Sequence, residues 1–260
     1  MNYSVCPKCG HAPLPAEQGL PVACPACGIV LAKFKASPAL ELRGAGGACA
    51  PGAGFLAPLL FHVPPEIAKL NWYSRCATLA AFTLFTFKII HDTNIAYGDL
   101  GGHFLWLVIT PWHEAGHVVF RLFGQFMAIL GGTLAQHLMP IVLGLALLIK
   151  RRDPFGAALC FWLLGYSVIY MGWYMHDAGD PQAMSLDGHT SADTDGHDFV
   201  HIFSYLGAWW LLKATSIGIF FGKTGEAMMC AGLVWAAYIV WLQKSKLSDS
   251  PFAESTLDGE

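Results

Sequence analysis

The residues best suited to chemistry in this chain are His113, Glu114 and His117, which form an HExxH sequence. On a helix this spacing puts the two imidazoles one turn apart on the same face, with the carboxylate beside them. Two imidazoles placed in this way can bind one zinc ion, and the adjacent carboxylate can act as a general base toward water. We therefore predict that His113 and His117 are metal ligands and that Glu114 is the catalytic base.

The HExxH sequence lies in an apolar stretch, Phe104–Phe123, that is long enough to cross a bilayer. Ionisable groups in hydrocarbon are costly unless a metal ion, water or polar partners satisfy them, and they usually mark function. Pro111 leaves the Leu107 carbonyl without its intrahelical donor, so we expect a kink and a wet pocket beside His113. Three further polar groups are expected to line this pocket, namely Thr110, Gln136 and His137.

A catalytic zinc site usually has three protein ligands and one open position, so the two histidines need a third ligand. Candidates lie in residues 176–201, which are rich in histidine and aspartate and contain no lysine or arginine. Asp198 is the preferred third ligand because it stands just before an apolar helix, at membrane depth. Asp177, at the end of the preceding apolar segment, and Asp187 are the alternatives.

Four cysteines near the N-terminus form two copies of one short motif, Cys6-Pro7-Lys8-Cys9-Gly10 and Cys24-Pro25-Ala26-Cys27-Gly28. Each CxxC turn presents two thiolates to one metal, and four thiolates in tetrahedral arrangement make a closed structural zinc site. The alternative, two disulfides or a redox pair, is disfavoured because so small a segment needs the metal to fold. We predict that residues 1–35 form a zinc ribbon bound through Cys6, Cys9, Cys24 and Cys27.

The elements that must position the HExxH sequence are predicted to be membrane helices. Of the 260 residues, 55% are hydrophobic and 13% are charged, whereas about a quarter of the residues of a soluble domain are charged. We predict an all-α polytopic helical bundle over residues 76–242, with a linker and interfacial segment at 36–75 and a polar tail at 243–260. Its six apolar segments are Cys76–Ile90, Phe104–Phe123, Met127–Ile149, Phe155–Met175, Phe199–Phe221 and Ala227–Leu242.

Composition also indicates where the protein lies and what it contacts. A net charge of −3 gives no support for a nucleic-acid partner. A ribbon that binds zinc needs reduced thiols, which places it in the cytosol. We expect a multi-pass protein of a bacterial-type cytoplasmic membrane, with the lipid bilayer and a membrane-protein or membrane-peptide substrate as partners, and a ribbon able to recruit another protein.

The pattern resembles the site-2 protease family of intramembrane zinc metalloproteases, whose members carry HExxH on a transmembrane helix and take a third ligand from an aspartate on a later one. The resemblance implies that His113 and His117 bind zinc, that Glu114 is the base, and that the substrate is a locally unwound peptide in or beside the membrane. The family's third ligand usually lies in an LDG-type motif. Leu186-Asp187-Gly188 matches this motif in letters, and Asp198 matches it in context. The fused ribbon suggests a divergent, bacterial-type branch.

Three other interpretations remain open from the sequence. A divalent-cation transporter also places His and Glu on a transmembrane helix, but Ala115-Gly116 lacks the proline of that pattern and no internal repeat is visible. A haem-binding bundle would use His113, His117 and His137 and would leave Glu114 unexplained. A non-catalytic scaffold would only hold the zinc ribbon at the membrane.

Overall fold

The computed structural model describes residues 57–92, 104–180 and 196–248, together with Cys6, Ala12, Leu14 and residues 22–25. The chain divides into two compact units, Met1–Gly54 and Phe55–Glu260. In the first unit Cys6 and Cys24 are buried. Cys9 and Cys27, and with them the predicted ribbon, lie outside the described residues, as do the predicted linker up to residue 56 and the tail from residue 249.

The second unit is helical, with a short parallel strand pair formed by β1 and β2. The elements are α2 (Ala57–Leu60), β1 (Ile67–Ala68), α3 (Lys69–Asp92), α4 (Phe104–Phe120), η3 (Arg121–Phe123), α5 (Gln125–Ile149), α6 (Pro154–Asp177), α7 (Asp198–Leu206), α8 (Ala208–Leu212), α9 (Ala214–Gln243), η4 (Lys244–Lys246) and β2 (Leu247–Ser248). In the strand pair Ile67 lies opposite Leu247 and Ala68 opposite Ser248. The pair thereby ties the start of α3 to the end of α9.

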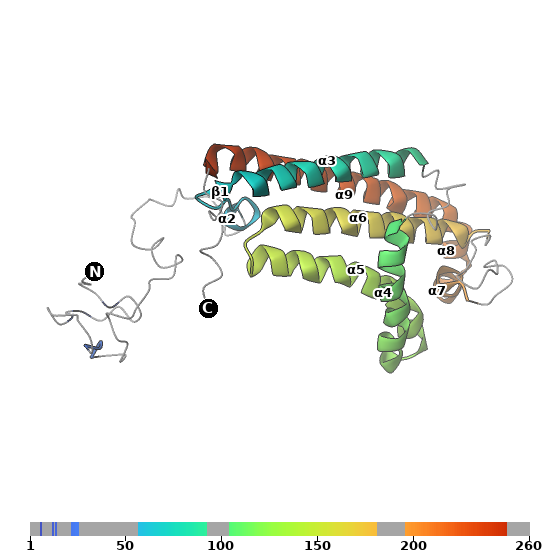
Figure 1. Ribbon diagram of the computed structural model, residues 1–260. Helices are drawn as coiled ribbons and strands as arrows, with labels where there is room; N and C mark the ends of the chain where they lie inside the picture. The colour runs from blue at the N-terminus through green and yellow to red at the C-terminus, as the bar shows by residue number, and fades with distance from the viewer. Residues whose placement is uncertain are drawn as a thin grey trace. The chain divides into compact units, whose positions relative to one another are not determined.

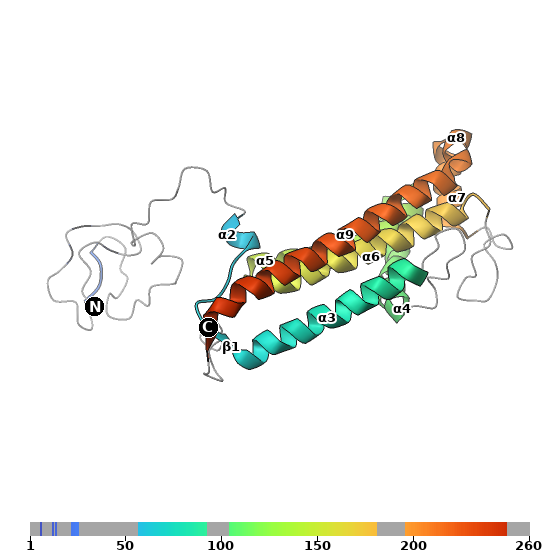
Figure 2. The same ribbon diagram turned by 90° about the horizontal axis from the view of Figure 1, so that it is seen from above.

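The long helices α3, α5, α6 and α9 run alongside one another, and α4 crosses them steeply (Figure 1). Figure 2, seen from above, shows α9 beside α6 and α3 alongside them, with α4 viewed nearly end-on. The helix α6 packs against both α5 and α9 and buries residues along its whole length. It is therefore the central element against which the others are placed.

Glycines allow α6 and α9 to pack backbone to backbone. A Cβ on Gly172 of α6 would lie 2.5 Å from the Gly222 nitrogen of α9, and a Cβ on Gly165 would lie 2.8 Å from the Gly225 oxygen. Small residues at such contacts are typical of helix pairs in membranes, where close backbone packing provides the attraction. This contact fixes α6, which in turn supports the site described below.

The first half of α4 is held against α6 by a buried cluster. Ile109 is fully buried in a cluster that includes Trp162, Tyr166 and Ile169 of α6. Nearby, the Trp106 Nε1–H donates a hydrogen bond of 2.9 Å to the Tyr170 hydroxyl. These contacts position the HExxH segment, which lies in the next turns of α4.

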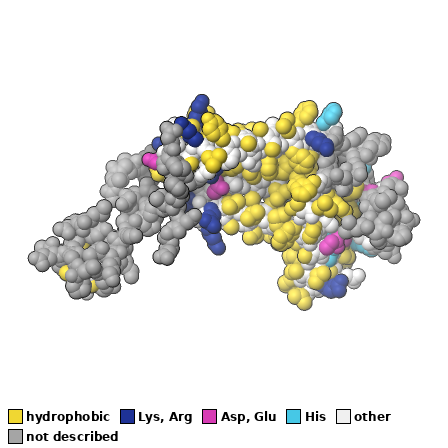
Figure 3. Space-filling model, in the orientation of Figure 1, with side chains coloured by type: hydrophobic (Ala, Val, Ile, Leu, Met, Phe, Trp, Pro, Cys, Tyr) yellow, Lys and Arg dark blue, Asp and Glu magenta, His cyan; other side chains and the backbone are white. Residues whose placement is uncertain are grey.

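Within the part of the chain that the structure describes, three helices are long and apolar enough to cross a membrane, as judged by length and composition: Gln125–Ile149, Pro154–Asp177 and Ala214–Lys246. In Figure 3 the face over the long helices is largely hydrophobic, and the Lys, Arg, Asp and Glu side chains lie mainly toward its two ends. Both observations are those of a membrane protein.

The two predicted C-terminal spans do not occur as separate helices. In place of Phe199–Phe221 and Ala227–Leu242 the structure has the short helices α7 and α8, followed by α9, which continues through residues 222–226 without a break. The predicted boundaries are therefore wrong here. The helix α3 likewise begins at Lys69, before the predicted start of a span at Cys76.

Local interactions explain why α9 continues where the sequence predicted a connection. The Lys223 Nζ lies 2.7 Å from the Glu226 Oε1, so the two charges neutralise each other one turn apart. Gly222 and Gly225 are retained in the helix because their missing side chains allow the contact with α6. Neither the charges nor the glycines therefore interrupt the helix.

Candidate metal centre

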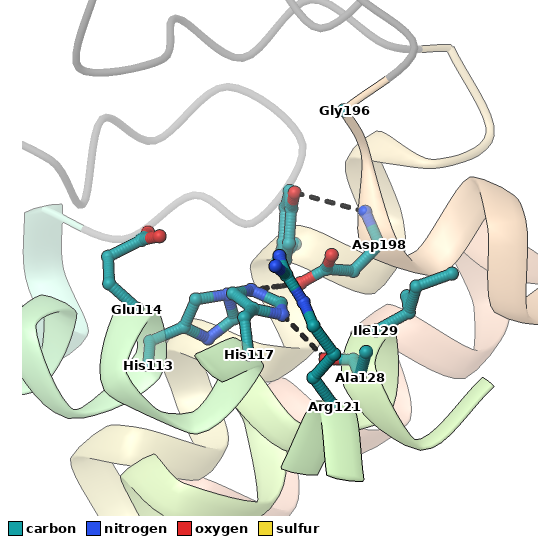
Figure 4. A pocket seen from close by; sticks show the side chains of 9 residues that line it. His113, Glu114, His117, Arg121, Ala128, Ile129, Gly196 and Asp198 are labelled. Atoms are coloured by element: carbon teal, nitrogen blue, oxygen red, sulfur yellow. Dashed lines mark hydrogen bonds and ion pairs between the residues drawn. The ribbon is translucent and has the colours of Figure 1, made fainter. Parts of the chain in front are cut away.

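The two histidines of the HExxH sequence meet one aspartate in space. The Asp198 Oδ2 lies 3.0 Å from the His113 Nε2 and 3.3 Å from the His117 Nε2. One ligand atom from each of the three residues lies within 4.8 Å of the others, and His113 and Asp198 are buried. Figure 4 shows the three side chains converging from α4 and α7. The structure thus brings together both predicted histidine ligands and the preferred third candidate.

The spacing of these atoms fits a single zinc ion. Two ligand atoms bonded to zinc at the usual bond lengths, with a tetrahedral angle between them, are separated by about 3.4 Å. The separations of 3.0 and 3.3 Å between Asp198 and the two imidazoles are close to this value. Two imidazoles and one carboxylate also leave one of four zinc positions open, as in catalytic sites.

Hydrogen bonds on the far side of each ring hold the imidazoles in the tautomer that a metal requires. The His113 Nδ1 lies 3.0 Å from the Gln136 Oε1, and the His117 Nδ1 lies 2.8 Å from the Ala128 carbonyl oxygen. Because both oxygens can only accept, each Nδ1 carries the proton and each Nε2 presents a lone pair to Asp198 in the neutral ring. A positive charge between these atoms, either a bound metal ion or a proton on an imidazole, would offset the repulsion between the lone pairs and the carboxylate.

Asp198 is the first residue of α7, outside the three helices of membrane-spanning length. Burial raises the pKa of its carboxyl, but the interactions with the His113 and His117 imidazoles together outweigh burial and hold this pKa below its usual range. The carboxyl is therefore ionised, which is the state in which it can bind a cation.

Contacts with α6 place Asp198 and its neighbour. The Asp198 N–H donates to the Tyr174 hydroxyl at 3.2 Å. His197 caps α7 by accepting from the Val200 N–H through its Nδ1 at 3.4 Å, and its ring stacks on Tyr174 with centroids 4.1 Å apart. The start of α7 is therefore held against the last turns of α6.

The structure separates one of the two alternative third ligands, Asp177, from the centre. The Asp177 Oδ2 lies 3.2 Å from the His197 Nε2, so Asp177 pairs with His197 and does not belong to the cluster around His113. Asp187 lies outside the described residues. Asp198 is thus the aspartate that the described structure places at the histidines.

The three polar residues predicted to line the pocket do not line it. Gln136 stands behind His113, is 1% exposed, and donates through its Nε2 to the Ser167 carbonyl at 3.4 Å. Thr110 donates to the Trp106 carbonyl at 2.9 Å, and the His137 Nδ1 bonds to the Thr133 carbonyl at 2.6 Å. The last two residues therefore bond to the preceding turn of their own helices.

Glycines let α5 approach α4 closely enough to support the two rings. A Cβ on Gly132 would lie 2.6 Å from the His117 Nε2 and 2.8 Å from the His113 Cε1. A Cβ on Gly131 would lie 2.6 Å from the Gly116 carbonyl oxygen. The imidazoles thus occupy the space that a side chain at residue 132 would fill. The adjacent pair Gly131-Gly132 is visible in the sequence, but its contact with the two rings within an unbroken helix was not predicted.

A cavity of about 400 Å³ opens beside the centre. Its lining consists of His113, Glu114, His117, Arg121, Ala128, Ile129, Tyr174, Gly196 and Asp198. The predicted base, Glu114, is exposed and lines this cavity, with its carboxylate to one side of the imidazoles in Figure 4. Sequence reasoning gave no role to Arg121 or Tyr174, although Arg121 continues the four-residue spacing of His113 and His117.

The fold and the site together define a class: a helical protein with helices of membrane-spanning length and a candidate His₂Asp metal centre beside a cavity. No protein-family model, curated protein or solved structure matches the chain.

Proposed function

We propose that this protein is an intramembrane zinc metalloprotease that hydrolyses peptide bonds of membrane-associated substrates. The observation that carries the proposal is the meeting of His113, His117 and Asp198 beside a cavity that Glu114 also lines. Helices of membrane-spanning length support a substrate drawn from the membrane or its surface.

The donor set suits zinc. Neutral imidazoles bind zinc well, their tautomers are set by Gln136 and Ala128, and the ionised Asp198 adds one negative charge. Zinc bound there would polarise a peptide carbonyl and lower the pKa of a water molecule toward neutrality.

Each side chain then has a defined task. His113, His117 and Asp198 would hold the ion, and all three residues line the cavity from which a substrate would approach it. Glu114 accepts the proton of the attacking water and delivers it to the nitrogen of the leaving amine, while the carbon–nitrogen bond breaks. Because Glu114 is exposed, its side chain has room to rotate toward the water.

The test is the substitution Glu114→Gln, which removes the base and leaves the three ligands. We expect the variant to keep its zinc and to lose at least about a hundredfold in cleavage rate, since general acid–base catalysis contributes that much or more. Cleavage is measured by quantitative profiling of new peptide N-termini in membranes from cells that express either form. Glu226→Gln is the matched control because Glu226 pairs with Lys223 and does not line the cavity.

Two outcomes would contradict the proposal. One is an identical set of new N-termini in cells with Glu114→Gln and with the unaltered protein. The other is zinc uptake into sealed vesicles that depends on Glu114, in a protein for which no cleaved substrate is found, because this would favour the transporter.

A further inference from the structure

A cationic side chain lies in the same cavity as the candidate metal centre. Arg121 follows His117 by four residues, in η3, and lines the cavity together with Glu114. In Figure 4 its side chain extends from η3 toward the imidazoles and Asp198, on the other side of the imidazoles from Glu114. Arg121 is exposed, so its guanidinium is accessible to a ligand in the cavity.

Arg121 has no ion-pair partner among the residues that the structure describes. Two other cations of the described chain are paired, Arg75 with Asp153 at 3.6 Å and Lys223 with Glu226. A divalent cation bound by the single carboxylate of Asp198 keeps one positive charge, which Glu114 balances. The guanidinium is then the uncompensated charge of the cavity, and it favours an anionic group on the substrate.

The order of the groups along α4 and the η3 turn that follows it gives the distance between this charge and the reacting bond. Glu114 and Arg121 are seven residues apart, which puts them on nearly the same side of the helix and about 10 Å apart along its axis. His117 lies between them. An extended peptide advances about 3.3 Å per residue, so a peptide with its carbonyl at the metal places a neighbouring side chain near Arg121 within two residues.

Resting on the proposed function, we propose that Arg121 binds a carboxylate of the substrate, the side chain of an Asp or Glu within two residues of the scissile bond. A guanidinium can bind a carboxylate through two parallel N–H···O bonds, which fixes position as well as charge. Ala128 and Ile129 form the apolar wall of the cavity and contact the rest of that side chain. The protease thereby selects unwound segments that carry an acidic residue.

The test uses binding, so that it does not depend on cleavage. The probes are short peptides that end in a metal-binding hydroxamate and differ only by Glu or Gln, either next to the hydroxamate or one residue further away. Their dissociation constants for the full-length, zinc-loaded protein in detergent are measured by titration calorimetry. We expect the Glu probe to bind about tenfold more tightly at one of the two positions, as a charge-assisted bond in a partly exposed site would give.

Arg121→Gln should remove this preference, and Arg121→Lys should keep part of it because the charge remains and the bidentate geometry is lost. Lys213→Gln is the matched control, since Lys213 is an exposed cation that does not line the cavity. It should bind both probes as the unaltered protein does.

Equal affinity for the Glu and Gln probes at both positions overturns the assignment of Arg121, and so does a preference that survives in Arg121→Gln. If no hydroxamate binds, the metal centre and the assignment both fail. If the probes bind with the expected preference but no peptide containing that acidic residue is cleaved, the proteolytic function fails and the carboxylate site stands.

Discussion

The two imidazoles of the centre are held from behind by different kinds of group. His117 bonds to the Ala128 carbonyl, a backbone atom that no substitution removes, whereas His113 bonds to the side chain of Gln136. Gln136 is itself buried and fixed by the Ser167 carbonyl. The orientation of His113 thus depends on one side chain that can be changed without touching a ligand.

We predict that Gln136→Leu weakens zinc binding at this centre by about 10- to 100-fold, which is the usual effect of losing an outer partner of a metal-binding histidine. In Gln136→Leu the His113 Nδ1–H is buried without an acceptor, so the ring loses its preferred tautomer and orientation. Gln136→Glu retains an acceptor and should bind zinc more tightly than Gln136→Leu. The dissociation constant is measured by competition with a chromogenic chelator. Equal losses in both variants would show that Gln136 only supports packing.

The sequence predicted the place of a single residue correctly where that place depends on spacing or on position relative to an apolar helix. The HExxH spacing identified His113 and His117, and the position before an apolar helix identified Asp198, all of which meet in the structure. Gln136 was predicted to line the pocket but lies behind His113. The position of a polar residue along an apolar helix shows how deep in the membrane it lies, but it does not show which neighbouring group the side chain faces. The proposed role of Arg121 in binding a substrate carboxylate depends on the cavity that this residue lines, and the sequence alone does not reveal that cavity.

At the scale of elements, the centre depends on how closely α4 and α5 approach. Gly116 and Gly131 allow the backbones to meet, and Gly132 leaves the space that the two rings occupy. Two histidines on α4 are not sufficient to form the centre. The neighbouring helix α5 must also lack a side chain at the turn that faces the two rings.

We predict that Gly132→Ala removes zinc from this centre while the helices remain folded. The new methyl group would lie 2.6 Å from the His117 Nε2, the atom proposed to bind the metal, so one of the rings must move. The matched control is Gly144→Ala on the same helix, where the nearest atom, the Cys160 Cβ, is 3.1 Å away and a small shift suffices. Zinc content is measured by mass spectrometry and helix content by circular dichroism. Full zinc content in Gly132→Ala would contradict this account.

The helices themselves were predictable in type and less so in extent. Long apolar runs identified the regions of α5 and α6, because hydropathy responds to lipid or core contact over many residues. Hydropathy gave the wrong boundaries for α9, because it predicted a break where Lys223 and Glu226 form an ion pair within one turn and glycines pack against α6. In a single sequence, charged residues next to glycines suggest a loop. Only the contacts in the folded protein, the ion pair within α9 and the packing of its glycines on α6, show that these residues fit a helix.

At the scale of the whole molecule, two units are each predicted to hold one zinc ion through unrelated donors. The unit Phe55–Glu260 contains the His₂Asp cluster, and the unit Met1–Gly54 contains the four cysteines of the predicted ribbon. Four thiolates would close the site in the predicted ribbon, whereas the His₂Asp cluster would leave one position of a zinc ion open. Because the donors lie in separate units, the two sites should lose their metal independently.

The zinc content of variants tests this division. We expect about two zinc ions per chain in the unaltered protein, about one in His113→Ala/His117→Ala, and about one in Cys6→Ser/Cys24→Ser, since each change removes two of the ligands that one site needs. The cysteine variant should still bind hydroxamate probes, and the histidine variant should not. Zinc is measured on purified protein after exhaustive dialysis, with chain concentration from amino-acid analysis. A content near one in both the unaltered protein and the histidine variant would mean that the cluster of His113, His117 and Asp198 binds no zinc, and the proposed hydrolysis would lose its basis.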